Sequence, residues 1–129
     1  MIYVDSSAIV KLVLDEEHSP ELRSWLGSRG EEHLVTSALS EVEVPRAVLG
    51  ARAAAQHAVP AVLQWFYRHE IDGWIRSTAA SLVQSDLRTL DAIHLATALS
   101  YPSRLSALIS YDSRLVRAAR QTGLQAVSP

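Results

Sequence analysis

The sequence contains no cysteine. This absence excludes disulfide bridges, metal sites built on thiolates and enzymes that use a cysteine nucleophile. It also suits a protein that works in a reducing compartment such as the cytosol. A metal site in this chain therefore has to be built without sulfur.

Long apolar stretches are also missing. No run approaches the roughly 20 residues that a helix needs to cross a bilayer. The opening MIYVD carries a charge at position 5, where a secretory signal peptide would be apolar. We therefore expect a cytoplasmic protein with no membrane association.

A surplus of positive charge is missing as well. The 12 basic and 14 acidic residues give a net charge of −2, and Lys11 is the only lysine. A protein that holds nucleic acid mainly by neutralising phosphates is usually basic. The composition alone thus argues mildly against nucleic-acid binding, but divalent cations bound to the acids would reverse the local charge and weaken this objection.

Apolar residues are plentiful enough for a core. The chain has 129 residues, and 48% of them are hydrophobic. This length matches the commonest domain size, at which roughly two-thirds of the unfolded surface is buried. We expect a single domain spanning residues 1–129.

Apolar runs that favour strands alternate with segments that favour helices. The helical segments follow capping residues and repeat apolar residues at spacings of three and four. This alternation is typical of an α/β protein with a parallel sheet covered on both faces. The expected strands are 1–4, 33–36, a weak 71–75, 107–111 and 124–127; the expected helices follow Ser6 or Ser7, Ser19, Ser37, Thr89 and Ser113, with two more at 51–67 and 78–84 and a kink or boundary at Pro45.

Four acidic residues from distant parts of the chain can meet at one edge of that sheet. Asp5 and Asp112 each follow a predicted strand directly, and open α/β sheets bind ligands at the carboxyl ends of their strands. Asp91 lies in the first turn of a predicted helix, and Glu43 on the helix after the second strand. Oxygen ligands without cysteine or a histidine cluster select Mg²⁺ or Mn²⁺. The pattern therefore indicates phosphodiester hydrolysis by a metal-activated water.

Each acid also has a simpler explanation. Asp5 and Asp112 can be plain helix caps. Asp91 can be a first-turn charge that interacts with the helix dipole, and Glu43 a solvated helix position. A phosphatase or phosphotransfer domain is a poor alternative, because it normally needs a lysine near a late strand and Lys11 is far from one. A metal-free RNA- or protein-binding module is the alternative from outside the enzymes.

Four segments together resemble a known family. They are MIYVDSSAIVKL, TSALSEVEVPRA, LRTLDAIHLATAL and ISYDSRLVRAARQTGLQAVSP, which span nearly the whole chain in order. They are similar to the motif regions of the PIN-domain family, and most of all to its VapC branch, the ribonuclease toxins of bacterial toxin–antitoxin pairs. The resemblance implies a three-layer α/β/α fold with a central, mainly parallel sheet, and RNA cleavage with Mg²⁺ or Mn²⁺. The alternative within the family is a catalytically degenerate RNA- or protein-binding PIN module.

The family's acids fall on four positions of this chain. The resemblance implies that Asp5, Asp91 and Asp112 hold the metal and, with Glu43, form the catalytic set. Glu41 competes with Glu43 for the second acid, because residues two apart on a helix face nearly opposite ways. Glu43 lies nearer the expected buried face and also matches the family pattern.

Further side chains lie near the predicted site. Ser7 takes the place of the small hydroxyl residue in the family's first motif. His94, three residues after Asp91, is either a metal ligand or base or, more simply, a histidine on the helix surface. Four cations either bind RNA phosphates or are ordinary surface charges: Lys11, Arg46, Arg114 and Arg117.

The resemblance also implies partners. VapC toxins act on structured RNA, so we expect an RNA substrate, with transfer RNA favoured. We further expect a cognate VapB-type antitoxin that crosses the active site, and a homodimer. The apolar stretch between Ala47 and Tyr67 is the segment that we expect to supply one of these interfaces.

Overall fold

The computed structural model describes residues 1–84 and 86–129, and a parallel β-sheet forms its centre. Within these residues the sheet has five strands in the order β3-β2-β1-β4-β5, and all neighbours run parallel. The strands are β1 (Ile2–Val4), β2 (Leu34–Ser37), β3 (Tyr67–His69), β4 (Ala107–Ile109) and β5 (Ala126–Val127).

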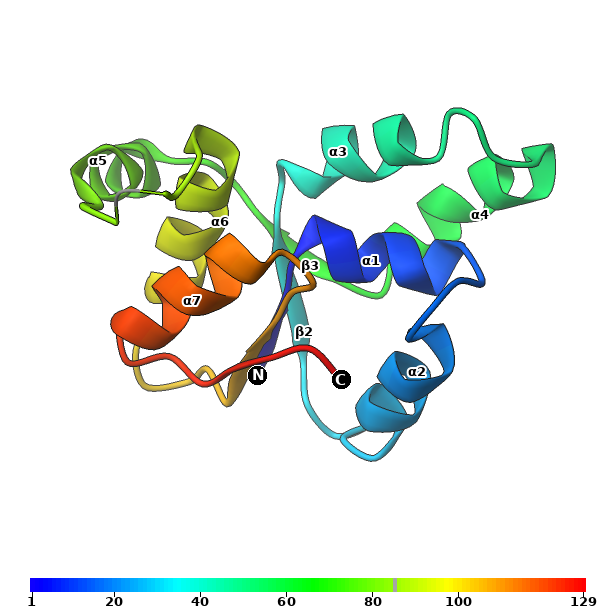
Figure 1. Ribbon diagram of the computed structural model, residues 1–129, viewed down its shortest axis with the longest axis horizontal. Coiled ribbons are helices and arrows are strands. Elements are labelled where there is room, and N and C mark those ends of the chain that lie inside the picture. The colour runs from blue at the N-terminus through cyan, green and yellow to red at the C-terminus, as the bar shows by residue number, and fades with distance from the viewer. Residues whose placement is uncertain (85) are drawn as a thin grey trace.

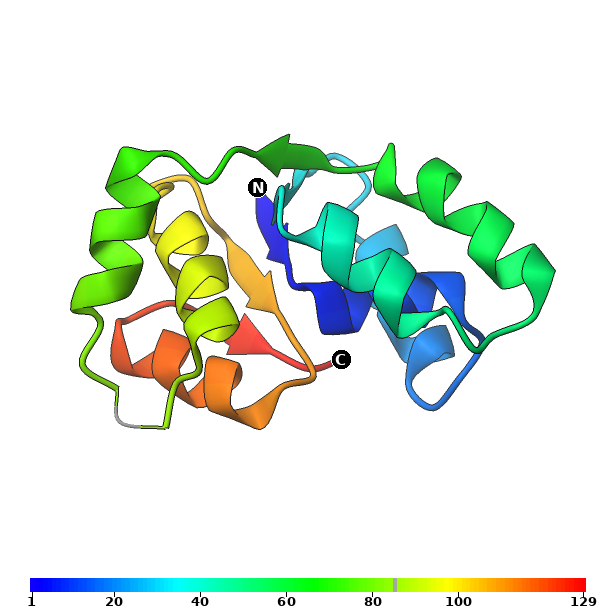
Figure 2. The same ribbon diagram turned by 90° about the horizontal axis from the view of Figure 1, so that it is seen from above.

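Helices cover both faces of this sheet, as Figures 1 and 2 show from two directions. This arrangement confirms the expected three-layer α/β/α architecture. No helix within residues 1–84 and 86–129 is both long and apolar enough to cross a membrane. One face carries α1 (Ser6–Val13), α2 (Ser19–Gly27), α3 (Ser40–Ala47) and α4 (Ala53–Leu63), and the other carries α5 (Gly73–Ser81), α6 (Thr89–Leu99) and α7 (Ser113–Gln121).

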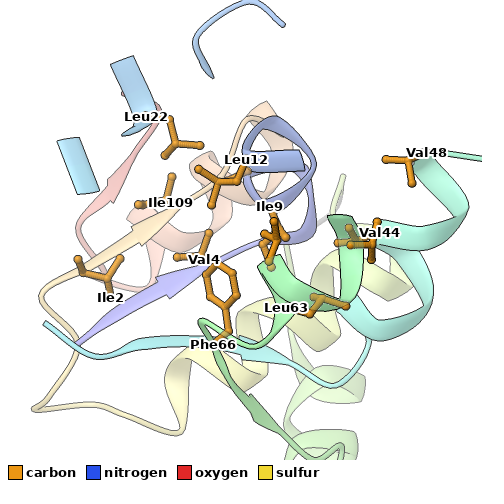
Figure 3. Packing of buried hydrophobic residues seen from close by; sticks show 13 residues of the cluster. Ile2, Val4, Ile9, Leu12, Leu22, Val44, Val48, Leu63, Phe66 and Ile109 are labelled. Carbon is orange, nitrogen blue, oxygen red and sulfur yellow. The ribbon is translucent and has the colours of Figure 1, made fainter. Parts of the chain in front are cut away.

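Strand β1 sends alternate side chains into two separate cores, because successive residues of a strand point to opposite faces. Ile2 and Val4 pack with α1 and α4 in the cluster shown in Figure 3. Tyr3 packs on the other face with Leu95 of α6 and Leu115 of α7. All three β1 side chains are fully buried. The strand is thus held from both sides, and so is the residue that follows it.

The order in which the strands are added to the sheet reverses at β1. Strands β2 and β3 extend the sheet on one side of β1, and the chain then crosses over to add β4 and β5 on the other side. The point between β1 and β4 is therefore a topological switch point, where two loops separate and open α/β sheets bind their ligands. Figure 1 shows α1 and α7 leaving this point in opposite directions.

The segment between α4 and α6 differs from the expectation. The strand predicted at 71–75 is wrong: the third strand is Tyr67–His69, and residues Gly73–Ser81 form α5. Asp72 explains the change, because its side chain accepts a hydrogen bond from the backbone N–H of Ile75 at 2.8 Å and so caps a helix. The helix predicted at 51–67 is accordingly shorter, as Ala53–Leu63, and the one predicted at 78–84 begins earlier, as Gly73–Ser81.

Pro45 marks a boundary, as predicted. It lies inside α3, and the helix ends two residues later at Ala47. A proline has no backbone N–H to continue the ladder of helical hydrogen bonds. Glu43 therefore lies in a short helix. The direction of the Glu43 side chain depends on where this helix begins after β2.

Candidate active site

Asp5 lies at the carboxyl end of β1 and caps α1, a position expected for Ser6 or Ser7. Its Oδ2 accepts hydrogen bonds from the backbone N–H of Ser7 (3.3 Å), the Ser7 hydroxyl (2.6 Å) and the Ser110 hydroxyl (2.8 Å). Only 5% of the residue is exposed. Its other oxygen, Oδ1, lies 3.4 Å from Nε2 of His94. Asp5 is thus a helix cap and also a buried carboxylate that faces a histidine.

Asp112 and Asp91 lie on the opposite side of the switch point, and both carboxylates face the guanidinium of Arg114. Asp112 caps α7, because its Oδ1 accepts from the backbone N–H groups of Arg114 (2.8 Å) and Leu115 (3.4 Å). Its Oδ2 accepts from the Arg114 guanidinium at 2.8 Å. Asp91, in the first turn of α6, accepts from the backbone N–H of Arg88 at 3.2 Å, and its Oδ2 lies 3.7 Å from Nε of Arg114.

Of the two glutamates on α3, Glu43 is the one that faces the other acids. Its Oε2 accepts hydrogen bonds from the Ser6 hydroxyl at 2.5 Å and from Nε2 of His94 at 2.7 Å. Glu41 points away, with its side chain 53% exposed and 2.6 Å from Nε of Arg68. The structure therefore brings together all four acids singled out from the sequence, in two groups around His94 and Arg114.

His94 is the centre of the first group, and the expectation of a surface histidine is wrong. The residue is only 2% exposed. Its Nδ1 lies 2.7 Å from the Tyr3 hydroxyl, while its Nε2 faces Glu43 and Asp5. Burial alone would lower the pKa of His94, but the charges of Asp5 and Glu43 and the hydrogen bond to Glu43 outweigh it, so the pKa is raised. Its spacing of three residues from Asp91 on one helix was the available signal.

Removing the Tyr3 hydroxyl should destabilise the protein. In Tyr3→Phe the buried Nδ1 of His94 loses its partner, which should lower the free energy of unfolding by about 1–3 kcal/mol. Urea denaturation followed by circular dichroism measures this value. The matched control is Tyr67→Phe, because Tyr67 is 65% exposed and a surface change should stay within about 0.5 kcal/mol. Equal losses in the two variants would contradict the proposed bond.

The acids differ in the direction of their pKa shifts. Burial raises the pKa of Asp91, and the charges of Asp112 and Asp5 add to this rise. Burial alone would also raise the pKa of Glu43 and of Asp112. The hydrogen bond and charge of His94 outweigh this effect at Glu43, and those of Arg114 outweigh it at Asp112, so both pKa values are lowered. Of these three acids, Asp91 is therefore the one whose charge the protein compensates least.

The kind of donor in this site suits a hard divalent cation. The acids offer only oxygen ligands, which Mg²⁺ prefers, and their mutual charge calls for a cation. Within the described ranges, no three histidine, aspartate or glutamate side chains stand close enough together to hold a metal ion. Instead, Asp5 and Glu43 face His94, and Asp91 and Asp112 face Arg114. The residues therefore fit the ion in type and charge.

Three of the predicted RNA-binding cations lie outside the acid groups. Nζ of Lys11 lies 4.7 Å from the centre of the Tyr111 ring, next to Asp112 in the chain. Arg46 is exposed on α3, one turn after Glu43. Arg117 of α7 forms an exposed ion pair with Asp86. It also lines a surface hollow of about 670 Å³. The fourth, Arg114, is bound to the acids themselves.

Comparison with known proteins gives one family throughout. Residues 2–121 match the sequence model of the PIN domain. The chain is 48% identical to Ribonuclease VapC35 of Mycobacterium tuberculosis H37Rv over 131 aligned positions, covering 100% of this chain and 97% of the relative. It is 41% identical to Ribonuclease VapC46 of the same strain, covering 99% and 97%. The crystal structure of FitAcB from Neisseria gonorrhoeae has the same fold, with a TM-score of 0.77 over 100% of this chain and 98% of that one, at 19% identity.

Proposed function

Since this chain belongs to the PIN-domain family, and within it to the VapC ribonucleases, we propose that it is a Mg²⁺-dependent endoribonuclease, with Mn²⁺ able to replace Mg²⁺. One observation carries this proposal. Asp5, Glu43, Asp91 and Asp112 come from four separate segments of the chain, yet Asp5 and Glu43 both face His94, Asp91 and Asp112 both face Arg114, and the charge of Asp5 acts on Asp91.

Three of the acids are proposed to hold the cation. Asp5, Asp91 and Asp112 offer carboxylate oxygens on both sides of the switch point. The ion, when bound, would supply positive charge at the scissile phosphate and its leaving oxygen. VapC ribonucleases are generally metal-dependent, which agrees with this assignment.

Glu43 is proposed to orient the attacking water. Hydrogen bonds from Ser6 and His94 fix one of its oxygens, and its lowered pKa keeps it ionised, so that it can accept a hydrogen bond from the attacking water. The nearby Ser7 hydroxyl donates to Asp5 at 2.6 Å. This bond gives Ser7 a structural role, so we expect hydrolysis without a covalent intermediate on the enzyme.

Removal of divalent metal tests the proposal directly. EDTA should abolish cleavage of RNA by the purified protein, and excess Mg²⁺ should restore it, because four crowded acids cannot stabilise a phosphate without a cation. The control is EDTA already saturated with Mg²⁺, and denaturing gels measure the products. Cleavage that persists in EDTA would contradict the metal-dependent mechanism. RNA binding without cleavage at saturating Mg²⁺ would instead favour the degenerate module.

For the substrate we propose structured RNA, with transfer RNA first, as the similarity to VapC toxins implies. Lys11, Arg46 and Arg117 are proposed to bind the phosphates on either side of the cleaved bond, because Lys11 lies over the ring of Tyr111, Arg46 is exposed on the helix of Glu43, and Arg117 lies on the helix that Asp112 caps. Cations at these places would compensate for the net charge of −2.

For partners we propose a VapB-type antitoxin and a second copy of this chain, in the cytoplasm of a bacterium. Exposed apolar side chains support an interface near α3 and α4. Val42 is 57% exposed and Leu49 is 64% exposed, and Trp65, just after α4, is 59% exposed. We propose that these side chains form part of one of the two interfaces.

A further inference from the structure

Arg114, a candidate for binding RNA phosphates, instead contacts two of the acids. Its guanidinium lies 2.8 Å from Oδ2 of Asp112, and its Nε lies 3.7 Å from Oδ2 of Asp91. The side chain is 30% exposed, whereas that of Arg117 on the same helix is 56% exposed. Arg114 thus fills the space between two of the three acids assigned to the metal.

The ion pair leaves the helix cap of Asp112 independent of Arg114's side chain. Oδ1 of Asp112 accepts from backbone N–H groups, while Oδ2 accepts from the guanidinium. The backbone N–H groups stay in place whatever side chain stands at position 114. The guanidinium therefore binds Oδ2 of Asp112, which the helix cap does not need. Oδ2 can exchange the guanidinium for another cation without loss of the cap.

The contacts of Arg114 are also incomplete. Its Nε is buried and has no hydrogen-bond partner among the residues that the structure describes, because 3.7 Å to Asp91 is too long for a hydrogen bond. A buried donor without a partner costs free energy. The guanidinium therefore neutralises charge between Asp91 and Asp112 while making a hydrogen bond to Asp112 and only an ion pair, without a hydrogen bond, to Asp91.

We propose that Arg114 is a tethered counterion that competes with the divalent metal ion for Asp91 and Asp112. This inference rests on the proposed metal-dependent function. In the protein without metal, the guanidinium relieves the repulsion between the two carboxylates. A metal ion held by Asp91 and Asp112 would take over this neutralisation and would repel the guanidinium, so Arg114 would have to leave for the ion to bind.

Metal binding without RNA tests the competition. Titration calorimetry with Mn²⁺ should give about a five-fold lower Kd for Arg114→Gln than for wild type, the factor that corresponds to one partly exposed ion pair. Glutamine keeps a polar side chain but removes the charge. Arg117→Gln is the matched control, because it removes an arginine from the same helix whose partner is Asp86, outside the acid groups.

The outcomes separate this inference from the function on which it rests. Tighter Mn²⁺ binding by Arg114→Gln alone supports the tethered counterion. Unchanged or weaker binding by Arg114→Gln, with measurable binding by wild type, overturns the inference and leaves the metal-dependent function intact. Equal tightening in Arg114→Gln and Arg117→Gln also overturns it, because the effect would then reflect total charge. Absence of binding in all three proteins overturns the metal-dependent function and the inference together.

A second measurement guards against a change in the fold. Without metal, Arg114→Gln should melt at a lower temperature than wild type, because Asp91 and Asp112 repel each other uncompensated. Saturating Mn²⁺ should raise its melting temperature by more than it raises that of wild type. An equal rise in both proteins would contradict the competition.

Discussion

Replacing Asp5 with asparagine should reduce RNA cleavage by on the order of 10²–10³-fold or more, the effect of removing one charged group that stabilises a transition state. Asparagine has nearly the same shape and is an equally good helix cap. Its side-chain oxygen can still accept from Ser7 and Ser110, which now donate to Oδ2. The substitution therefore removes a negative charge from the site while the start of α1 is kept.

The matched control for this variant is Asp72→Asn. Asp72 also caps a helix, accepting from the backbone N–H of Ile75 at 2.8 Å, but it lies at the start of α5, away from the acids. The Asp72→Asn variant should cleave RNA like wild type. Initial rates on one labelled RNA at saturating Mg²⁺ compare the variants, and thermal melting verifies that both fold. Similar rates for Asp5→Asn and Asp72→Asn would show that Asp5 is only a cap.

Glu43→Gln and Glu41→Gln should differ by a comparable factor, although the two residues are neighbours on one helix. Glu43 accepts from Ser6 and His94, whereas Glu41 pairs with Arg68 at the surface. Loss of a group that accepts a proton typically costs about 10²–10⁴-fold in rate. We therefore expect a loss of this order in Glu43→Gln and nearly unchanged cleavage in Glu41→Gln.

Single-turnover cleavage at enzyme excess measures this difference without interference from product release. Both substitutions remove one negative charge from α3, so general effects of charge cancel between them. A loss of RNA cleavage in Glu41→Gln equal to that in Glu43→Gln would contradict the assignment. Fluorescence anisotropy with uncleaved RNA would then show whether the common cause is RNA binding.

The sequence predicted the parts of the site that depend on strand ends. Asp5 and Asp112 follow apolar strands at the centre of the sheet, and such strands are visible as apolar runs. The edge strand Tyr67–His69 was missed because its residues are polar and partly exposed and so form no apolar run, although they pair with β2. The apolar residues Ile71, Trp74 and Ile75 were taken for a strand, but their spacing of three and four is helical, and they belong to α5 and its start.

The roles of His94 and Arg114 depend on tertiary contacts that no local pattern contains. Helix α6 is buried on most of its surface, from Ala92 to Ala98, so its apolar periodicity does not distinguish a solvent face on which to place His94. Arg114 looked like a surface cation two residues after Asp112. Only the position of α6 beside α7 shows that its guanidinium also reaches Asp91.

The pairing of β1 with β4 has a consequence for the time at which activity arises during synthesis. Asp5 emerges from the ribosome early, but the Ser110 hydroxyl that binds it is 105 residues further along the chain. The nascent N-terminal half can form β1 and β2, yet the other edge of β1 stays open until β4 has been translated. A ribosome-bound or truncated chain that ends before Asp112 therefore lacks the site. The acids at the end of β1 and after β4 are therefore brought together only once Asp112 has been translated.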